Sequence, residues 1–298
     1  MNRRQFLQIG TAAAAASSIP VSAAPNSRFR LVHFTDTHIE KELKADKGVA
    51  KCFSQIAKLK PDFCLAGGDL VYDALEADKP RAKQLFDMYG EAVKRLDCAV
   101  HSCPGNHDSF GVFEKSGVSL TDPEYGKKMF EDRIGPLYKS FDHKGWHFVT
   151  LDTVFIDGRK YRGFVDERQM NWLKADLEKN GTSKPVVIMC HIPLVTAALQ
   201  VVPGWGSLGN EIVVENSAEV VGLLEKYPVK LVLQGHTHIN ERVIWKDIDF
   251  TTTGAVSGNW WKGPRLGFPE GYAVLDISGD KVSWRFESYG WQSPAPEA

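Results

Sequence analysis

The stretch FRLVHFTDTH, from Phe29 to His38, decides the fold, because a mainly apolar run leads directly into a polar Thr-Asp-Thr-His. Short runs rich in aromatic and β-branched residues are typical of buried strands. Five further runs of this kind follow: Phe63–Ala66, Ala99–Cys103, His147–Leu151, Val186–Cys190 and Leu231–Leu233. The sequence therefore predicts a series of buried strands, several of which end at polar residues.

Helical patterns lie between several of these strands. They cover Gly48–Leu59, Pro80–Leu96, Asp166–Glu178 and Ser217–Tyr227. Pro61, Gly181 and Pro228 follow three of them and act as stop signals. Near the C-terminus, Tyr272–Ile277 and Lys281–Ser288 flank Ser-Gly-Asp and predict an antiparallel hairpin. Alternating strands and helices predict an α/β fold, and we expect a single domain because no repeat or linker interrupts the pattern.

The composition is that of an ordinary soluble protein. Of its 298 residues, 43% are hydrophobic and 24% are charged, and the formal net charge is −1. Such a balance disfavours a general nucleic-acid binder or a protein that coats anionic membranes.

The N-terminus has the order of regions found in a secretory signal. Arg3 and Arg4 are followed by a weakly apolar, Ala-rich run over Ile9–Ile19, and small residues close it at Ser22-Ala23-Ala24. The paired arginines resemble a twin-arginine export signal, although Asn2 and Gln8 depart from the usual pattern. We therefore expect a signal peptide over residues 1–24, a folded domain over 25–298 and a periplasmic or otherwise extracytoplasmic location.

The apolar run of this signal is too short and too weak to remain in the membrane. An Ala-rich disordered tail is the competing interpretation, and the order of regions disfavours it. We expect the export machinery to be a transient partner, and no integral membrane segment to remain after the signal is removed.

The cysteines number five and contain no CxxC pair: Cys52, Cys64, Cys98, Cys103 and Cys190. Several of them lie in apolar runs directly before a polar motif, where a small buried side chain suits a strand. We predict that they pack in the core rather than form disulfides or bind metal.

Polar motifs stand where five predicted strands end. In chain order they are Asp36-Thr37-His38, Gly67-Gly68-Asp69, Gly105-Asn106-His107-Asp108, His191 and Gly235-His236-Thr237-His238. Because the carboxyl ends of strands meet at one edge of an open α/β sheet, these side chains are expected to converge. The remaining histidines, His33, His101, His143 and His147, fall outside the motifs and are interpreted as structural.

The residue types in these motifs suit a metal site. Carboxylates, imidazoles and an amide oxygen are ligands for manganese, iron or zinc ions. The one-residue spacing in Asp36-Thr37-His38 and His236-Thr237-His238 would place both members on one side of an extended backbone. The glycines before Asp69, Asn106 and His236 permit sharp turns and close backbone approach.

The pattern D-x-H, G-D, G-N-H-D, H, G-H-x-H resembles the calcineurin-like metallophosphoesterases, from Asp36 to about Ser288. The resemblance implies an α/β four-layer αββα sandwich with two mixed sheets, and a two-metal phosphoester hydrolase. One metal would be held by Asp36, His38, Asp69 and His238. The other would be held by Asp69, Asn106, His191 and His236. A hydroxide bridging the metals would attack phosphorus in line, with His107 as general acid or charge stabiliser.

The resemblance to the family leaves the roles of two residues open. Tyr72 stands where purple acid phosphatases have an iron-binding tyrosine, but those enzymes lack the histidine that is present here as His38. We therefore expect Tyr72 to pack behind the ligands. Asp108 either tunes His107 or stabilises its own turn. The protein serine/threonine phosphatases would show G-D-x-x-D-R-G and G-N-H-E, which this chain does not have.

The substrate is less constrained. The long segments 108–139 and 195–215 are candidate recognition loops. Aromatic and basic residues that could contact a nucleobase or a phosphate are Trp205, Trp260, Trp261, Lys262 and Arg265, although packing on the scaffold would also explain them. Asp152, at a strand end, either supports the site or caps a turn. Among subfamilies the chain looks most like the cyclic-nucleotide phosphodiesterases.

Other functions compete with a cyclic-nucleotide phosphodiesterase. A broad phosphomonoesterase or a nucleotide pyrophosphatase would use the same metals. A nuclease is disfavoured because no basic stripe is present. A binding protein that holds metal without turnover belongs to another class, but no expected ligand is missing from the motifs.

Overall fold

The computed structural model describes residues 27–207 and 209–296. The signal peptide predicted over residues 1–24 lies outside these residues. Within the described ranges, none of the helices has both the length and the apolar character needed to cross a membrane.

The first sheet is mixed and has five strands in the order β13-β12-β1-β2-β3. They are β1 (Arg28–Phe34), β2 (Phe63–Ala66), β3 (Ala99–Ser102), β12 (Gly271–Ser278) and β13 (Lys281–Ser288). Strands β1, β2 and β3 run parallel, whereas β12 is antiparallel to both β1 and β13. The expected C-terminal hairpin is β12–β13.

The second sheet is also mixed and has six strands in the order β10-β11-β9-β8-β5-β4. They are β4 (Lys139–His143), β5 (Trp146–Thr150), β8 (Val186–Met189), β9 (Val229–Gln234), β10 (Glu241–Trp245) and β11 (Ile248–Thr252). Its four central strands are parallel, and β4 and β10 pair antiparallel at the two edges.

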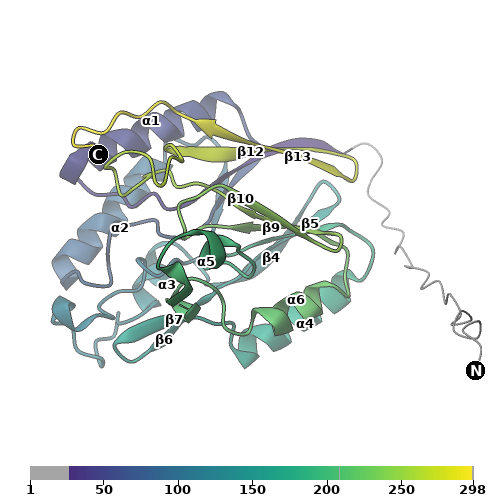
Figure 1. The fold of residues 1–298 in the computed structure, drawn as a ribbon, viewed down its shortest axis with the longest axis horizontal. Helices are drawn as coiled ribbons and strands as arrows, with labels where there is room; N and C mark the ends of the chain where they lie inside the picture. Colours follow the sequence, from purple (N-terminus) through teal and green to yellow (C-terminus); the bar gives the residue numbers. More distant parts are fainter. Residues whose placement is uncertain (1–26, 208, 297–298) are drawn as a thin grey trace, which may run out of the picture.

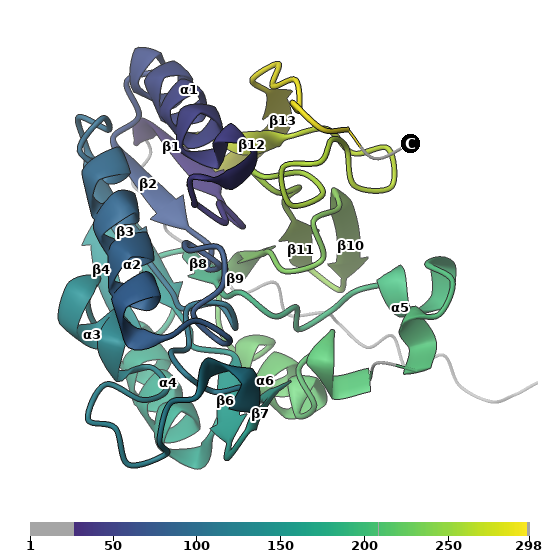
Figure 2. The same ribbon diagram turned by 90° about the vertical axis from the view of Figure 1, so that its left-hand side faces the viewer.

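Helices cover the outer face of each sheet. The first sheet carries α1 (Ala45–Lys58) and α2 (Lys79–Val93), and the second carries α4 (Glu167–Asn180) and α6 (Ser217–Leu224). Figure 1 shows α1 on one side of the two sheets and α4 and α6 on the other. In Figure 2, α1 and α2 lie against β1, β2 and β3. The predicted four-layer αββα sandwich is confirmed.

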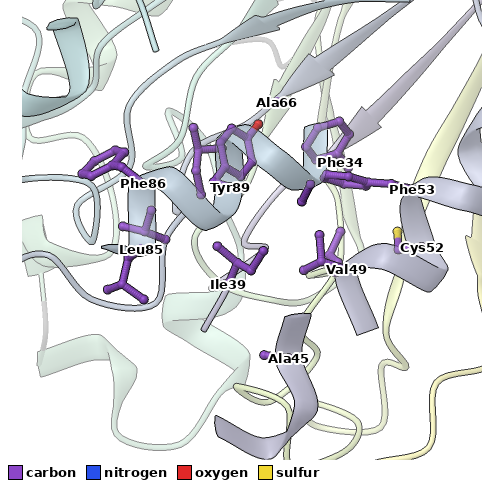
Figure 3. Close-up of a cluster of buried hydrophobic side chains, with 14 of the residues drawn as sticks. Phe34, Ile39, Ala45, Val49, Cys52, Phe53, Ala66, Leu85, Phe86 and Tyr89 are labelled. Carbon is purple, nitrogen blue, oxygen red and sulfur yellow. The ribbon is translucent and has the colours of Figure 1, made fainter. Parts of the chain in front are cut away.

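Strand alternation assigns residues to the layers. In β1, Phe29 and Leu31 belong to the cluster between the two sheets, whereas Val32 and Phe34 face the helices. Figure 3 shows Phe34 beside Phe53 of α1, with the side chains of α2 nearby. Because successive strand residues point to opposite faces, one apolar run can fill two cores.

Helix starts follow local chemistry. Asp78 accepts a hydrogen bond from the backbone N–H of Arg81 at the start of α2, and Asp166 does the same for Gln169 in α4. Gly181, with φ 54°, ends α4. The four predicted helices are all present, with ends displaced by a few residues.

Several strands were not predicted. Besides β4, β10 and β11, they include the hairpin β6 (Val154–Asp157) and β7 (Lys160–Gly163), which forms a separate two-stranded sheet. Strand β11 is an inner strand and mostly buried. The other four are short and partly polar, as in KSFDH for β4, since edge and hairpin strands bury little of their surface. The long segments 108–139 and 195–215 contain the short helices α3 (Lys128–Arg133) and α5 (Ala198–Val201).

Candidate metal centre

The five polar motifs converge at the carboxyl ends of β1, β2, β3, β8 and β9. Six of the seven predicted ligands are buried: Asp36, His38, Asp69, Asn106, His191 and His238. The seventh, His236, is half-buried and faces a cavity. Side chains up to 202 positions apart in the sequence therefore share one site.

The first group consists of Asp36, His38 and His238. The Nε2 atom of His238 lies 3.2 Å from Oδ1 of Asp36 and 3.2 Å from Nε2 of His38. The Nε2 atom of His38 lies 3.5 Å from Oδ2 of Asp69, so this group adjoins the central carboxylate.

The second group consists of Asp69, His191 and His236. The Nε2 atom of His191 lies 3.2 Å from Oδ2 of Asp69 and 3.2 Å from Oδ1 of Asn106. The same oxygen of Asp69 therefore faces both groups. The structure places Asp69 between them, where a bridging ligand would have to stand.

Backbone carbonyls fix the orientation of all four histidines. The Nδ1 atoms of His38, His191 and His238 lie 3.1, 2.8 and 2.5 Å from the carbonyl oxygens of Tyr72, Gly67 and Gly258. His236 is turned the other way, with Nε2 2.8 Å from the carbonyl of Glu211. Metal-binding histidines are commonly held through their second nitrogen in this manner.

Lone pairs face one another at the centre of the first group. Burial lowers the pKa of His38 to about 3, so this imidazole is neutral. Because a carbonyl can only accept, the single proton of His38 is on Nδ1 and its Nε2 atom is an acceptor. The buried Oδ1 atom of Asp36 has no hydrogen-bond partner. Acceptors this close repel one another unless a cation lies between them, so the residues fit a metal ion.

The second group also attracts positive charge. Burial lowers the pKa of His191, but Asp69 outweighs it and raises that pKa to about 9. Burial likewise raises the pKa of Asp69, yet His191 and His107 hold it well below the usual range. A divalent cation would satisfy Asp69 in place of these protons.

The backbone of the ligand motifs is not extended. Asp36 and His38 have φ values of 55° and 38°, and His236 and His238 have 71° and 59°. The expectation that both members of each pair lie on one side of an extended backbone was therefore wrong. These residues adopt left-handed conformations that cost of order 1–3 kcal/mol each, as is common where a site imposes its own geometry.

The glycines allow the close approach that the sequence predicted. A Cβ atom on Gly105 would lie 2.1 Å from Oδ1 of Asp69, and one on Gly235 would lie 2.2 Å from Oγ1 of Thr35. No side chain fits at either place, so glycine is required for the motifs to meet.

His107 stands at the edge of the two groups and is partly exposed to the cavity. Its backbone N–H donates to Oδ1 of Asp69 over 2.8 Å, and its Nδ1 atom lies 3.5 Å from Oδ1 of Asp73. Burial lowers the pKa of His107, but Asp69 and Asp73 raise it to about 9. Asp73, which the sequence analysis did not single out, is the carboxylate that faces this histidine.

Asp108 stabilises turns and does not face His107. Its Oδ1 atom accepts from the backbone N–H groups of Leu70 and Val71, and its Oδ2 atom accepts from that of Gly105. It thereby joins the Gly-Asp loop to the Gly-Asn-His-Asp loop. Of the two roles left open for Asp108, the structure shows the turn-stabilising one.

Tyr72 packs beside His38, with ring centroids 6.3 Å apart. Its backbone carbonyl, described above, orients that histidine. Asp152 forms an ion pair with Lys127 and accepts from the backbone N–H of Val154, so it anchors the segment 108–139 to the core.

A cavity of about 240 Å³ opens beside the two groups. Asp69, Asn106, His107, His236 and His238 line its inner end. The outer wall comes from strand β7 and from connecting segments: Tyr161, Trp205, Glu211, Trp260 and Arg265.

The outer wall is built around a guanidinium group. The Cζ atom of Arg265 lies 5.3 Å from the ring centre of Trp260 and 5.7 Å from that of Trp205. The ring of Trp260 in turn lies 4.6 Å from that of His238. The wall is therefore in direct contact with a predicted metal ligand.

Trp261 does not contribute to this wall. It is fully buried, and its Nε1–H donates to the carbonyl of His38 over 2.9 Å. Lys262 is exposed and is absent from the cavity lining. Of the five residues predicted to contact a nucleobase or a phosphate, Trp205, Trp260 and Arg265 line the cavity.

Known proteins match both the sequence and the fold. The family model described as "Calcineurin-like phosphoesterase" matches residues 29–240. The chain belongs to this family. As a calcineurin-like phosphoesterase with phosphodiesterase and phosphatase relatives, it is a metal-dependent phosphoester hydrolase. The two groups described above could each hold a metal ion, and so could the overlapping combination of His38, Asp69 and His107.

Two relatives indicate the kind of ester that related proteins act on. A protein from Coxiella burnetii named "Probable cyclic nucleotide phosphodiesterase" is 25% identical over 226 residues, covering 75% of this chain and 79% of its own. The glycerophosphodiester phosphodiesterase of Enterobacter lignolyticus is 24% identical over 218 residues, 70% of each chain. A dimetal phosphatase from Danio rerio shares the fold, with a TM-score of 0.63, 15% identity and coverage of 88% and 96%.

Proposed function

We propose that this calcineurin-like phosphoesterase is a two-metal phosphodiesterase that hydrolyses small nucleotide-like esters, cyclic nucleotides in particular. The observation that carries the proposal is the convergence of seven oxygen and nitrogen ligands into two groups that share one oxygen of Asp69. Two adjacent cation sites with one shared carboxylate are the arrangement used for in-line displacement at phosphorus.

The ligands divide naturally between two ions. Asp36, His38 and His238 would hold the first, and Asn106, His191 and His236 would hold the second, with Asp69 shared. Manganese or iron suits this mixture of oxygen and nitrogen donors best, and zinc is compatible with it. When bound, such a pair lowers the pKa of a water molecule and neutralises charge on the phosphoryl group.

Residues of the chain would position the shared carboxylate and donate a proton to the leaving oxygen. Asp69 accepts a hydrogen bond from the backbone N–H of His107, which fixes the shared carboxylate beside the histidine. His107 faces the cavity, and Asp73 behind it favours its protonated form. A protonated imidazole there can donate to the leaving oxygen or stabilise the phosphoryl charge.

The cavity favours a small diester as substrate. Its volume of about 240 Å³ is suited to a small molecule, whereas a protein segment would need an open groove. The wall around Arg265 offers aromatic faces and a cation to the part of the substrate beyond the phosphate. The names of the two relatives above support a phosphodiester substrate, and the first supports a cyclic nucleotide.

Two alternatives use the same site differently. In a phosphomonoesterase, the outer wall of the cavity would contact a monoester. In a nucleotide pyrophosphatase, it would contact a diphosphate. A protein that binds metal without turnover is disfavoured because every ligand, together with His107, is in place.

We also propose that the protein acts outside the cytoplasm, in the periplasm or an equivalent compartment. The support is the order of regions in residues 1–24, with Arg3 and Arg4 before the apolar run. Replacing both arginines by lysine should abolish export, and normal export of that variant would contradict a twin-arginine signal.

The test of the activity is hydrolysis by the metal-loaded protein. After chelation and reloading with manganese, iron or zinc, rates are measured on bis-p-nitrophenyl phosphate, p-nitrophenyl phosphate, cyclic nucleotides and nucleoside diphosphate compounds. We expect chelation to abolish activity and the diesters to exceed the monoester. Activity that persists without metal would reject the two-metal mechanism, and a preference for the monoester would favour the phosphomonoesterase.

A further inference from the structure

Two cysteines 34 positions apart meet in the helix-facing layer of the first sheet. Cys64 lies within β2, and Cys98 directly precedes β3. Their Sγ atoms are 3.6 Å apart. Strand register explains the contact: Cys64 pairs with Val100, and Cys98 lies two positions before Val100, on the same face of the parallel sheet.

The remaining cysteines behave as the sequence predicted. Cys52, Cys103 and Cys190 are buried, and within the described residues only Cys64 and Cys98 have their sulfur atoms in contact with each other. Core packing therefore accounts for three of the five cysteines. It does not by itself explain why the other two meet at the sheet surface.

The two thiols differ in accessibility. Cys64 is completely buried, whereas Cys98 is only partly buried and has the exposed residues Asp97 and Ala99 on either side. A hydrogen bond from Cys64 lowers the pKa of the Cys98 thiol. The accessible thiol is thus also the one that more readily becomes the attacking thiolate.

We propose that Cys64 and Cys98 form an intramolecular disulfide when the protein meets a disulfide donor in an oxidising compartment. The sulfur atoms must approach from 3.6 Å to about 2.05 Å. Side-chain rotation at the partly exposed Cys98 can supply this movement. The proposal needs the extracytoplasmic location proposed above, because thiols stay reduced in most cytoplasms.

The reaction is a thiol–disulfide exchange. The Cys98 thiolate attacks one sulfur of the donor, an oxidoreductase disulfide or oxidised glutathione, and one donor thiolate leaves. The Cys64 sulfur, after losing its proton, then displaces the second donor sulfur. Two cysteine thiols lose two electrons and two protons, and the donor disulfide becomes two thiols.

The cross-link would close the chain around the central carboxylate. Asp69 and α2 both lie between the two cysteines, so the disulfide would tie β2 to the start of β3 around the segment that carries the shared ligand. A closed loop of this length restricts the unfolded chain, and it should stabilise the folded protein. The bond lies on the helix side of the sheet, and neither cysteine lines the cavity.

The test counts thiols on the purified full-length protein in glutathione buffers from fully reduced to fully oxidised, with chelator present throughout. Samples are quenched in acid, unfolded, alkylated and weighed by mass spectrometry. We expect five alkylated cysteines in reduced buffer and three in oxidised buffer, with peptide mapping that joins Cys64 to Cys98.

Two variants separate this cross-link from non-specific oxidation. Cys98→Ser should show four alkylated cysteines in both buffers, whereas the matched control Cys52→Ala should keep the Cys64–Cys98 link and show two in oxidised buffer. Five free thiols at the most oxidising ratio, a stable glutathione adduct on Cys98 or links between two chains would each overturn the proposal. Because no activity is measured, this outcome is independent of the proposed function.

Discussion

The inner and outer ends of the cavity are built in opposite ways. The inner end consists of residues that follow strands within a few positions, such as Asp69 after β2 and His236 after β9. The outer wall comes from connections, with Tyr161 on the β6–β7 hairpin and Trp205 in the segment after α5. The predicted metal ligands are therefore positioned by the sheets. The outer wall, which would contact the substrate beyond its phosphate, lies on connecting segments, where sequence changes are generally tolerated.

The wall is nevertheless held firmly. Arg159, at the turn of the β6–β7 hairpin, donates to the carbonyls of Gly111 and Val118, and Tyr125 donates to that of Gly158. The hairpin and the segment 108–139 thus form one unit that presents Tyr161. This comparison predicts that changes at the inner end abolish turnover, and that changes in the wall alter substrate choice.

The largest effect is expected from Asp69→Ala. Losing the oxygen that faces both groups should lower the bound metal and reduce kcat/KM on bis-p-nitrophenyl phosphate by about 10³-fold or more. Metal analysis and steady-state kinetics measure this, with Asp157→Ala, an exposed hairpin residue, as control. Near-normal turnover by Asp69→Ala would contradict a catalytic role for the inner end of the cavity.

His107→Asn should come next. We expect kcat to fall by about 10²–10⁴-fold while both metals stay bound, since the role proposed for His107 is to donate a proton and not to bind metal. The loss should be greater for an alkyl leaving group than for p-nitrophenolate, which needs no proton. Equal losses on both esters would indicate charge stabilisation instead of proton donation.

Trp260→Ala and Trp261→Ala sharpen the comparison, because the two residues are adjacent but only Trp260 lines the cavity. Trp260→Ala should raise KM for cyclic nucleotides about tenfold, as expected for a lost stacking contact of about 1–3 kcal/mol. Its kcat on bis-p-nitrophenyl phosphate should change little.

Trp261→Ala should instead lower the free energy of unfolding by about 3–5 kcal/mol, because a large buried ring is removed. Urea unfolding and substrate kinetics on both variants separate these effects. If Trp260→Ala destabilises the protein as much as Trp261→Ala and leaves KM unchanged, the outer wall is only packing.

The smallest effect, a pH-dependent change in stability, is expected at the end of the second sheet opposite the predicted metal ligands. The two ring nitrogens of His147, at the start of β5, each lie 2.7 Å from a carboxylate, of Asp142 and of Asp176. Burial lowers the pKa of His147, but these two carboxylates outweigh it and raise that pKa. The charged form is therefore favoured in the folded state.

Its stabilising contribution should be complete below the unfolded pKa of about 6.5 and lost as pH rises through the folded pKa. His147→Gln should therefore be less stable than the parent at pH 5.5 and nearly equal to it at pH 9.5, with kcat unchanged at both. Urea unfolding at the two pH values measures this. A stability difference between parent and variant that grows with pH would show that the charged form of His147 does not stabilise the fold.

Local patterns were sufficient to predict most of the scaffold. The β1, β2, β8 and β9 strands and all four long helices were placed correctly, since their burial imposes apolar periodicity on the sequence. The edge strands β4 and β10 and the hairpin β6–β7 were missed because they bury too little surface to leave such a pattern. The extended backbone expected for Asp36 and His38 was wrong, since a local spacing rule cannot anticipate a left-handed conformation fixed by the surrounding loops.

The sequence by itself determined the reaction chemistry, because the residue types that attract metal ions occur in fixed order at strand ends and the sheet has to bring those ends together. Only the tertiary structure decided which neighbours each residue has. It assigned Asp73 rather than Asp108 to His107, separated Trp260 from Trp261, and brought Cys64 to Cys98. The physical reason is that contacts between distant segments depend on loop paths and strand register, which leave no local signature in the chain.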